Sequence, residues 1–191
     1  NFNKSLEIIG MNMKENCHVI IETTVPPGTC EKIVLPCLQK CFSKRGLNPE
    51  KIKLAHSYER VMPGEKYYDS IVNFWRVYSG INDISADECK EFLSNIINTK
   101  DYPLKRLSST TSSETAKLLE NTYRTVNIAF IAEWTRYSEE IGLDLFEIID
   151  AIQQRPTHRN IRYPGVGIGG YCLTKDPAFA PASSKQIFNK D

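Results

Sequence analysis

The chain has 191 residues, enough to bury a hydrophobic core as one large or two small domains. Its 24 basic and 23 acidic side chains nearly cancel, so the charge does not indicate a nucleic acid or an anionic membrane as a partner. No apolar run approaches the ~20 residues that a membrane-spanning helix needs.

The cysteine pattern favours a reduced, cytoplasmic setting. The chain contains no C-x-x-C pair and no histidines at zinc-binding spacing, so we expect neither a disulfide framework nor a metal site. The six cysteines are Cys17, Cys30, Cys37, Cys41, Cys89 and Cys172. The chain begins with Asn, inside a predicted helix, which we interpret as a piece of a longer protein.

The first 109 residues alternate between strand and helix patterns. Strands are expected where short apolar runs lie between turn residues, over residues 17–24, 51–56, 76–80 and 104–107. Helical spacing predicts a helix that ends near Met13 and a second one over residues 29–46, with Thr29 as its N-cap. A third helix is expected to begin at Ser85, which forms a capping box with Glu88. This alternation is typical of an open α/β sheet, and we predict the latter half of a Rossmann-like parallel sheet.

After Ser109 the pattern becomes helical. No Gly or Pro interrupts residues 112–141, and Thr111 with Glu114 forms a capping box, which predicts one helix of about thirty residues. Asp144 is the expected N-cap of a second helix. We therefore predict two domains, residues 1–109 in the α/β class and residues 110–191 all helical.

The long helix carries an apolar stripe at 3.6-residue spacing, which we interpret as core. The stripe consists of Leu119, Tyr123, Val126, Phe130, Trp134, Tyr137 and Ile141. Ile128, Ile131 and Ala132 make the opposite side apolar as well. A helix that is apolar on both sides is expected to be covered by its own domain and by a second copy, so we predict a homodimer through this helix.

A polar patch lies on the first turns of the same helix. Lys117 and Asn121 are i, i+4 neighbours, with Glu114 and Arg124 close to the same side. Two interpretations stay open: a solvated face, or a cation and an amide held by rigid backbone to bind an oxyanion or a substrate hydroxyl.

Residues 163–177 are rich in glycine and contain a cysteine. Gly165, Gly167 and Gly170 match the G-x-G-x-x-G spacing, but that motif needs a buried strand before its first glycine. The preceding residues are polar and end in Pro164, so we exclude a dinucleotide fingerprint and expect another ligand contact or a tight turn.

Cys172 follows these glycines directly and is either a nucleophile or a structural residue. Only the thiolate attacks, and Lys175 or a helix N-terminus would favour it, while Asp176 could serve as base or orienting group. Glu22 and Glu59 each follow a predicted strand, at the edge where open α/β sheets bind ligands.

Together these residues resemble the UDP-glucose/GDP-mannose dehydrogenase family. Four segments carry the resemblance in the family's order: Glu22-Thr-Thr-Val-Pro-Pro-Gly-Thr, Glu59-Arg-Val-Met-Pro-Gly, Glu114-Thr-Ala-Lys-Leu-Leu-Glu-Asn-Thr-Tyr-Arg and Pro164-Gly-Val-Gly-Ile-Gly-Gly-Tyr-Cys-Leu-Thr-Lys-Asp-Pro. The resemblance covers nearly the whole chain. It implies a two-step oxidation of a nucleotide-sugar C6 alcohol to the acid, with two NAD molecules.

The resemblance also implies residue roles. Cys172 would form a thiohemiacetal and then a thioester, Lys117 with Asn121 would stabilise the oxyanion, and Asp176 would move protons. Glu59 and a water held by Thr24 would serve thioester hydrolysis, and Thr24, Glu59 and Lys175 would approach the cofactor. The implied substrate contacts are Glu59, Arg60, Val61, Lys117, Asn121, Arg124, Tyr163, Gly165, Gly167, Gly169 and Gly170.

The chain also departs from the family pattern. Tyr58 stands where members usually have Pro, and Tyr171 where they often have His or Ser. The initial fingerprint unit and the final Rossmann-like domain of the family have no counterpart in this sequence, so we expect the chain to be inactive by itself. The form Glu59-Arg-Val-Met resembles enzymes for UDP-N-acetylhexosamines. A non-catalytic dimerisation or scaffold fragment is the alternative.

Overall fold

The computed structural model describes residues 2–62 and 64–190. The chain forms two compact units: one extends to Lys117 and includes the residues from Phe179 on, and the other is Leu118–Ala178. The predicted domain boundary near Ser109 stays a prediction.

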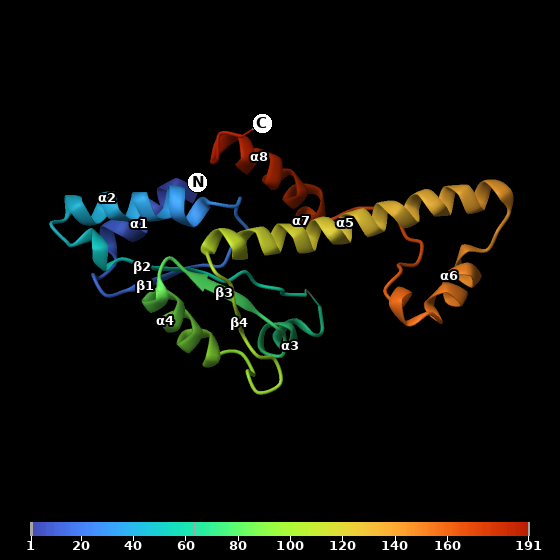
Figure 1. The fold of residues 1–191 in the computed structure, drawn as a ribbon, viewed down its shortest axis with the longest axis horizontal. Coiled ribbons are helices and arrows are strands. Elements are labelled where there is room, and N and C mark those ends of the chain that lie inside the picture. Colours follow the sequence, from blue (N-terminus) through green and yellow to red (C-terminus); the bar gives the residue numbers. More distant parts are fainter. Residues whose placement is uncertain (1, 63, 191) are drawn as a thin grey trace. The chain divides into compact units, whose positions relative to one another are not determined.

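The first unit contains a four-stranded sheet (Figure 1). Its strands follow the order β1 (His18–Ile21), β2 (Lys53–His56), β3 (Val77–Gly80) and β4 (Lys105–Arg106). All four predicted strands are present, each shorter than expected. The pairs β1–β2 and β3–β4 are parallel, and β2 and β3 are antiparallel, so the predicted parallel sheet contains one antiparallel pair.

Helices cover both faces of this sheet, with α1 and α2 on one face and α4 on the other (Figure 1). The helices of the first unit are α1 (Phe2–Asn12), α2 (Leu35–Lys44), α3 (Tyr67–Val72), α4 (Asp83–Ser94) and α8 (Phe179–Gln186), with short turns η1 (Cys30–Val34) and η2 (Pro49–Lys51). Because side chains alternate along a strand, Leu54 packs with Leu38 and Phe42 on one face, and Ala55 packs with Cys89 on the other.

The capping residue of α4 differs from the predicted one. Asn82 is the N-cap, and its side chain accepts a hydrogen bond of 2.8 Å from the backbone N–H of Ser85. Ser85 lies inside the helix, where its hydroxyl accepts a hydrogen bond from the backbone N–H of Leu54. The predicted Ser85–Glu88 capping box is therefore wrong, since Asn is an equally good N-cap one turn earlier.

The predicted long helix is confirmed as α5 (Thr110–Ile141), which has 32 residues. Its first turn is capped by Ser109, whose hydroxyl accepts a hydrogen bond of 3.1 Å from the backbone N–H of Ser112. The predicted capping box of Thr111 and Glu114 is wrong, because the Glu114 carboxylate instead accepts hydrogen bonds from the loop after β1. With the sheet and this helix, the α/β class followed by a helical part is confirmed.

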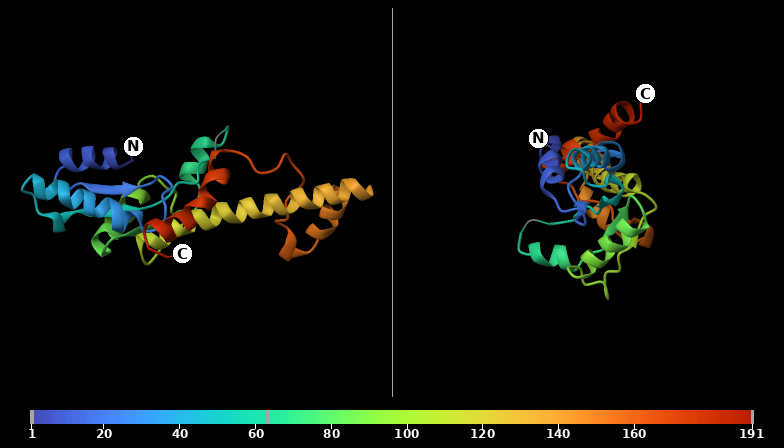
Figure 2. Two further views of the ribbon diagram at one scale, coloured as in Figure 1. Left: turned by 90° about the horizontal axis from the view of Figure 1, so that it is seen from above. Right: turned by 90° about the vertical axis from the view of Figure 1, so that its left-hand side faces the viewer.

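The second unit packs the C-terminal half of α5 against α6 (Leu145–Gln153), which folds back beside it (Figure 2). Its core consists of Ile131, Leu145 and Ile149, with Ile161 packed against them. The N-cap predicted at Asp144 is confirmed, since its side chain accepts hydrogen bonds from the backbone of Phe146 and Glu147. The remaining elements are η3 (Pro156–His158), α7 (Tyr171–Lys175) and η4 (Asp176–Ala178).

The Leu119 stripe is not the core of this unit. Leu119, Tyr123, Val126, Phe130, Trp134, Tyr137 and Ile141 are 46% to 68% exposed. The turn that ends α5 explains the difference: Gly142 adopts φ +75°, and Leu143 donates a backbone hydrogen bond of 2.9 Å to Ser138. This turn returns the chain to the Ile131 side, so the interpretation of the stripe as core is wrong for the single chain.

Among the described residues, no helix combines the length and the apolar character needed to span a membrane.

Candidate active site

The loops after β1 and β2 lie at the same edge of the sheet, because the two strands are parallel. Glu22 follows β1 directly and pairs with Arg76, whose guanidinium lies 2.6 Å from the Glu22 carboxylate. Glu59 stands in the loop after β2. The structure therefore brings both predicted edge carboxylates to one end of the sheet, with a mostly buried arginine that the sequence analysis did not identify.

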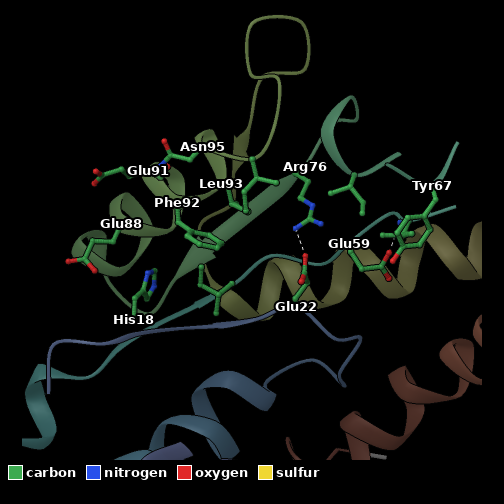
Figure 3. Close-up of a pocket in the computed structure, with 14 residues that line it drawn as sticks. His18, Glu22, Glu59, Tyr67, Arg76, Glu88, Glu91, Phe92, Leu93 and Asn95 are labelled. Atoms are coloured by element: carbon green, nitrogen blue, oxygen red, sulfur yellow. Dashed lines mark hydrogen bonds and ion pairs between the residues drawn. The ribbon is translucent and has the colours of Figure 1, made fainter. Parts of the chain in front are cut away.

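A cavity of about 1000 Å³ lies at this edge (Figure 3). Figure 3 shows Arg76 pointing at Glu22, with Glu59 on the same side of the cavity. Its lining comes from β1, α3, α4 and the edge loops: His18, Ile20, Glu22, Glu59, Val61, Tyr67, Ile71, Arg76, Glu88, Glu91, Phe92, Leu93, Asn95 and Ile96. The four carboxylates can accept hydrogen bonds from hydroxyl groups, whereas their charge disfavours a phosphate.

Lys117 and Glu59 meet in the first unit. Lys117 Nζ donates a hydrogen bond of 2.9 Å to the backbone carbonyl of Glu59 and lies 3.9 Å from its carboxylate. Lys117 is only 8% exposed. Its polar patch on the helix could be either a solvated face or a binding site for an oxyanion or a hydroxyl group. A buried lysine paired with a carboxylate excludes the interpretation of a solvated face for this residue.

Asn121 and Asp176 meet in the second unit. The Asn121 amide donates a hydrogen bond of 2.6 Å to the Asp176 carboxylate, which is fully buried. Lys175 lies 2.8 Å from the other oxygen of Asp176, and the Thr125 hydroxyl donates to the backbone of α7. These contacts fasten α7 to α5 and hold the Asp176 carboxylate in one orientation.

Cys172 is the second residue of α7 and is exposed. The glycine-rich stretch before it is coil that follows η3. In the part of the chain that the structure describes, no strand leads directly into its first glycine, as a dinucleotide fingerprint would require. Gly165, Gly167, Gly169 and Gly170 each have open space where a side chain would project. The thiol and these glycines are therefore accessible from solvent within their unit.

The other predicted contact residues differ in their surroundings. Arg60 donates hydrogen bonds to the Trp75 carbonyl and to the Tyr58 hydroxyl. The Tyr163 hydroxyl donates to Asp150 at 2.5 Å, which fixes the start of the glycine-rich stretch. Arg124 is exposed and Thr24 is half-buried.

For two residues near the site, the sequence analysis did not identify the contacts that the structure shows. Tyr58 is buried beneath Lys117, and its only signal was that it replaces the usual proline. Glu114 holds the loop that follows Thr24, whereas the sequence analysis placed it in the polar patch of the helix and in a capping box with Thr111.

The polar edge of the sheet suits part of a dinucleotide. Thr24, Glu22 and Glu59 offer hydroxyl and carboxylate groups of the kind that bind ribose hydroxyls and a carboxamide. Among residues 2–62 and 64–190, no glycine-rich turn leads from a strand into a helix to hold the pyrophosphate. The same described residues contain no group of three or more His, Cys, Asp or Glu side chains arranged to hold a metal ion.

Two family models match the chain along most of its length. Residues 2–99 match the NAD binding domain of the UDP-glucose/GDP-mannose dehydrogenase family, and residues 111–188 match the central domain of the same family. The chain belongs to the UDP-glucose/GDP-mannose dehydrogenase family. This membership confirms the resemblance, the class of oxidoreductase and NAD as the cofactor of the matched domain.

Several similar proteins are named as dehydrogenases of acetylated sugar nucleotides. The chain is 38% identical over 183 residues to a UDP-N-acetyl-D-mannosamine dehydrogenase from Methanocaldococcus jannaschii, covering 96% of this chain and 39% of the relative. A solved UDP-D-ManNAc dehydrogenase from Pyrococcus horikoshii has a TM-score of 0.83 at 30% identity, over 98% of this chain and 43% of that one.

A second solved relative has a similar fold. The NDP-N-acetyl-D-galactosaminuronic acid dehydrogenase from Methanosarcina mazei has a TM-score of 0.80 at 28% identity, over 100% of this chain and 39% of that one. The chain therefore spans about two fifths of the length of these relatives.

Proposed function

We propose that this chain forms part of a dehydrogenase that oxidises the C6 alcohol of a UDP-N-acetylhexosamine to the carboxylic acid. The observation that carries the proposal is the arrangement around α7. The accessible Cys172 is the second residue of α7, and Asn121 donates a buried hydrogen bond of 2.6 Å to Asp176, which directly follows this helix. A thiol presented on fixed backbone, four residues from an oriented carboxylate, suits covalent catalysis at an aldehyde carbon.

The proposed route has four steps. The alcohol first loses a hydride and a proton to become an aldehyde, and the Cys172 thiolate then adds to the aldehyde carbon, which leaves an oxyanion on C6. This thiohemiacetal loses a second hydride to become a thioester. Water then adds to the thioester carbon, and the C–S bond breaks to release the acid and the thiol. Bound NAD would accept the hydride in both oxidation steps.

Lys117 and Glu59 have complementary roles in this proposal. The Lys117 ammonium stabilises the oxyanion, with Asn121 beside it on the helix. Asp176 moves protons to and from the reacting oxygen. Glu59 and Thr24 orient the water that hydrolyses the thioester, and Thr24, Glu59 and Lys175 lie against the cofactor.

The choice of substrate rests on the relatives. The relatives from Methanocaldococcus jannaschii and Pyrococcus horikoshii are named for UDP-N-acetylmannosamine, and the one from Methanosarcina mazei for another acetylated sugar nucleotide. We extend this class to the present chain. Arg60, Val61, Arg124, Tyr163 and the glycines of residues 165–170 are the proposed substrate contacts.

The proposal includes a cytoplasmic homodimer. Seven apolar side chains along α5 remain about half exposed in the single chain, and a second copy packed about a two-fold axis would cover them. This exposed face also favours the second candidate function, a dimerisation or scaffold fragment without catalysis.

A cysteine variant separates the two candidates. The full reading frame that contains this chain is given UDP-N-acetylmannosamine and NAD, and acid and NADH are measured. Cys172→Ser should lose acid formation by orders of magnitude but still bind the sugar nucleotide, while Cys17→Ser, at another exposed cysteine, should keep the rate. Unchanged turnover in Cys172→Ser would overturn the assignment, and no turnover in the unmodified protein would favour the scaffold.

A further inference from the structure

We propose that Tyr58 is a positioning residue whose aromatic face holds the Lys117 ammonium in its working position. The importance of this contact for catalysis rests on the proposed function of Lys117, but the contact itself does not. Nothing in the reaction chemistry requires an aromatic residue here.

Two cations lie close to one buried ring. Tyr58 is 2% exposed, and the Lys117 ammonium lies 5.4 Å from the centre of its ring. The Arg60 guanidinium carbon lies 5.0 Å from the same centre. Cations within about 6 Å of an aromatic ring are attracted by the negative charge of its face, and the attraction grows when the pair is shielded from water.

Lys117 needs such a contact because burial removes most of its water. Its ammonium donates to the Glu59 carbonyl at 2.9 Å, and the Glu59 carboxylate lies 3.9 Å away. The long lysine side chain has many rotamers, so one directional hydrogen bond leaves several orientations open. The ring of Tyr58 restricts them, since it occupies the space beside the ammonium.

The Tyr58 hydroxyl has a separate role, which is to fix the ring. It accepts a hydrogen bond of 2.8 Å from Arg60, and Arg60 also donates to the backbone carbonyl of Trp75, just before β3. Because Tyr58 precedes Glu59, the ring and the carbonyl that bind Lys117 belong to one short segment. The ring thus supports the ammonium, and the hydroxyl ties this segment to the start of β3.

The test measures the contact directly by NMR on the 191-residue chain with ¹³C-labelled lysine. The methylene protons next to the Lys117 ammonium should resonate upfield of those of the other lysines, and should show cross-relaxation with the Tyr58 ring. Tyr58→Phe keeps the ring and should keep the upfield shift, whereas Tyr58→Leu should abolish it. Tyr68→Leu, at an exposed tyrosine on α3, is the matched control and should change nothing.

If Tyr58→Leu fails to fold, the lysine chemical shifts and the cross-relaxation of the unmodified chain still test the contact. Ordinary lysine shifts for Lys117 in the unmodified chain would overturn the proposal, as would an upfield shift that survives Tyr58→Leu in a folded protein.

Activity of the full reading frame separates this proposal from the proposed function. Tyr58→Leu should lower kcat about tenfold with little change in KM, and Tyr58→Phe should stay close to the unmodified rate. If the upfield shift is present but Lys117→Ala leaves kcat unchanged, the oxyanion role fails and the contact stands. If Lys117→Ala abolishes turnover but the upfield shift is absent, the contact fails and the oxyanion role stands.

Discussion

The carboxylate of Glu114 accepts a hydrogen bond of 2.6 Å from the backbone N–H of Gly28, a residue 86 positions earlier in the chain. The same carboxylate accepts a second one of 2.8 Å from Cys30. Burial raises the pKa of Glu114, and the two N–H groups act in the opposite direction. One side chain near the start of α5 thus satisfies the donors at the start of η1 and fixes the loop that carries Thr24.

Removing this carboxylate should destabilise the first unit. Glu114→Ala leaves two buried N–H groups without an acceptor, at about 1–3 kcal/mol for each. Glu114→Gln keeps one acceptor oxygen, so its free energy of unfolding should fall by less than that of Glu114→Ala. The free energy of unfolding in urea measures both, and Glu140→Ala, at an exposed glutamate on the same helix, is the control. Equal losses for Ala and Gln would contradict an anchoring role based on paired acceptors.

Gly28 should tolerate no side chain. It adopts φ +86°, and an added methyl group would lie 2.8 Å from the Phe188 ring and 2.9 Å from Ile187. Gly28→Ala should cost about 1–3 kcal/mol of unfolding free energy, from backbone strain together with these clashes. Gly165→Ala, where an added methyl group would have open space, should stay within about 0.5 kcal/mol. A Gly28→Ala chain as stable as the original would mean that residues 187–188 move away easily.

Sequence patterns predicted the elements of this fold better than their ends. The four strands and α5 follow from periodicity, which is a property of neighbouring residues. The caps at Ser85 and Thr111 were wrong because Asn82 and Ser109 compete for the same backbone donors, and only packing decides between them. The exposed stripe was misassigned for the same reason: periodicity identifies two apolar faces but not the one on which α6 packs.

The sequence identified residues of the candidate site, but it did not predict which of them contact one another. Lys117, Asn121 and Asp176 were identified as site residues, and the structure gives their partners across 55 to 58 positions of sequence. No local pattern contains such distances along the chain. Tyr58 shows the limit most clearly, because a substitution in a motif reports that something differs and not what the new side chain contacts.

The buried His56 should make stability depend on pH. Burial lowers the pKa of His56 to about 4, and its ring is hydrogen-bonded to the Ser113 hydroxyl at 2.7 Å. Between about pH 6.5 and 4 the unfolded chain binds a proton that the folded chain does not, so stability falls as the pH falls through this window. The full effect is about 3 kcal/mol.

Glu114 changes the pH dependence of stability in the opposite direction, so the measurement must separate its effect from that of His56. Its raised pKa means that the folded chain binds a proton more readily, so its contribution to stability is lost as the pH rises. We therefore compare unfolding free energies of the original chain and of His56→Gln from pH 7 to 4, since Glu114 contributes to both. The difference between the two should shift in favour of His56→Gln as the pH falls, and parallel curves would contradict the assignment.

The exposed stripe on α5 should control the association of two chains. Trp134 lies in the middle of an aromatic row, with ring centres 6.3 Å from Phe130 and 5.6 Å from Tyr137, both edge to face. Rigid aromatic clusters of this kind dominate many protein interfaces.

A charge at the centre of this row tests the homodimer. Fully burying each large apolar side chain gains about 1.5–3 kcal/mol, so Trp134→Glu both removes such a gain and brings two like charges near the two-fold axis. Sedimentation at micromolar concentration should give a dimer for the original chain and a monomer for Trp134→Glu. Ile84→Glu, at an exposed residue of α4, should remain a dimer. If the original chain sediments as a monomer and still melts cooperatively, the stripe is stable in water and the dimer proposal fails.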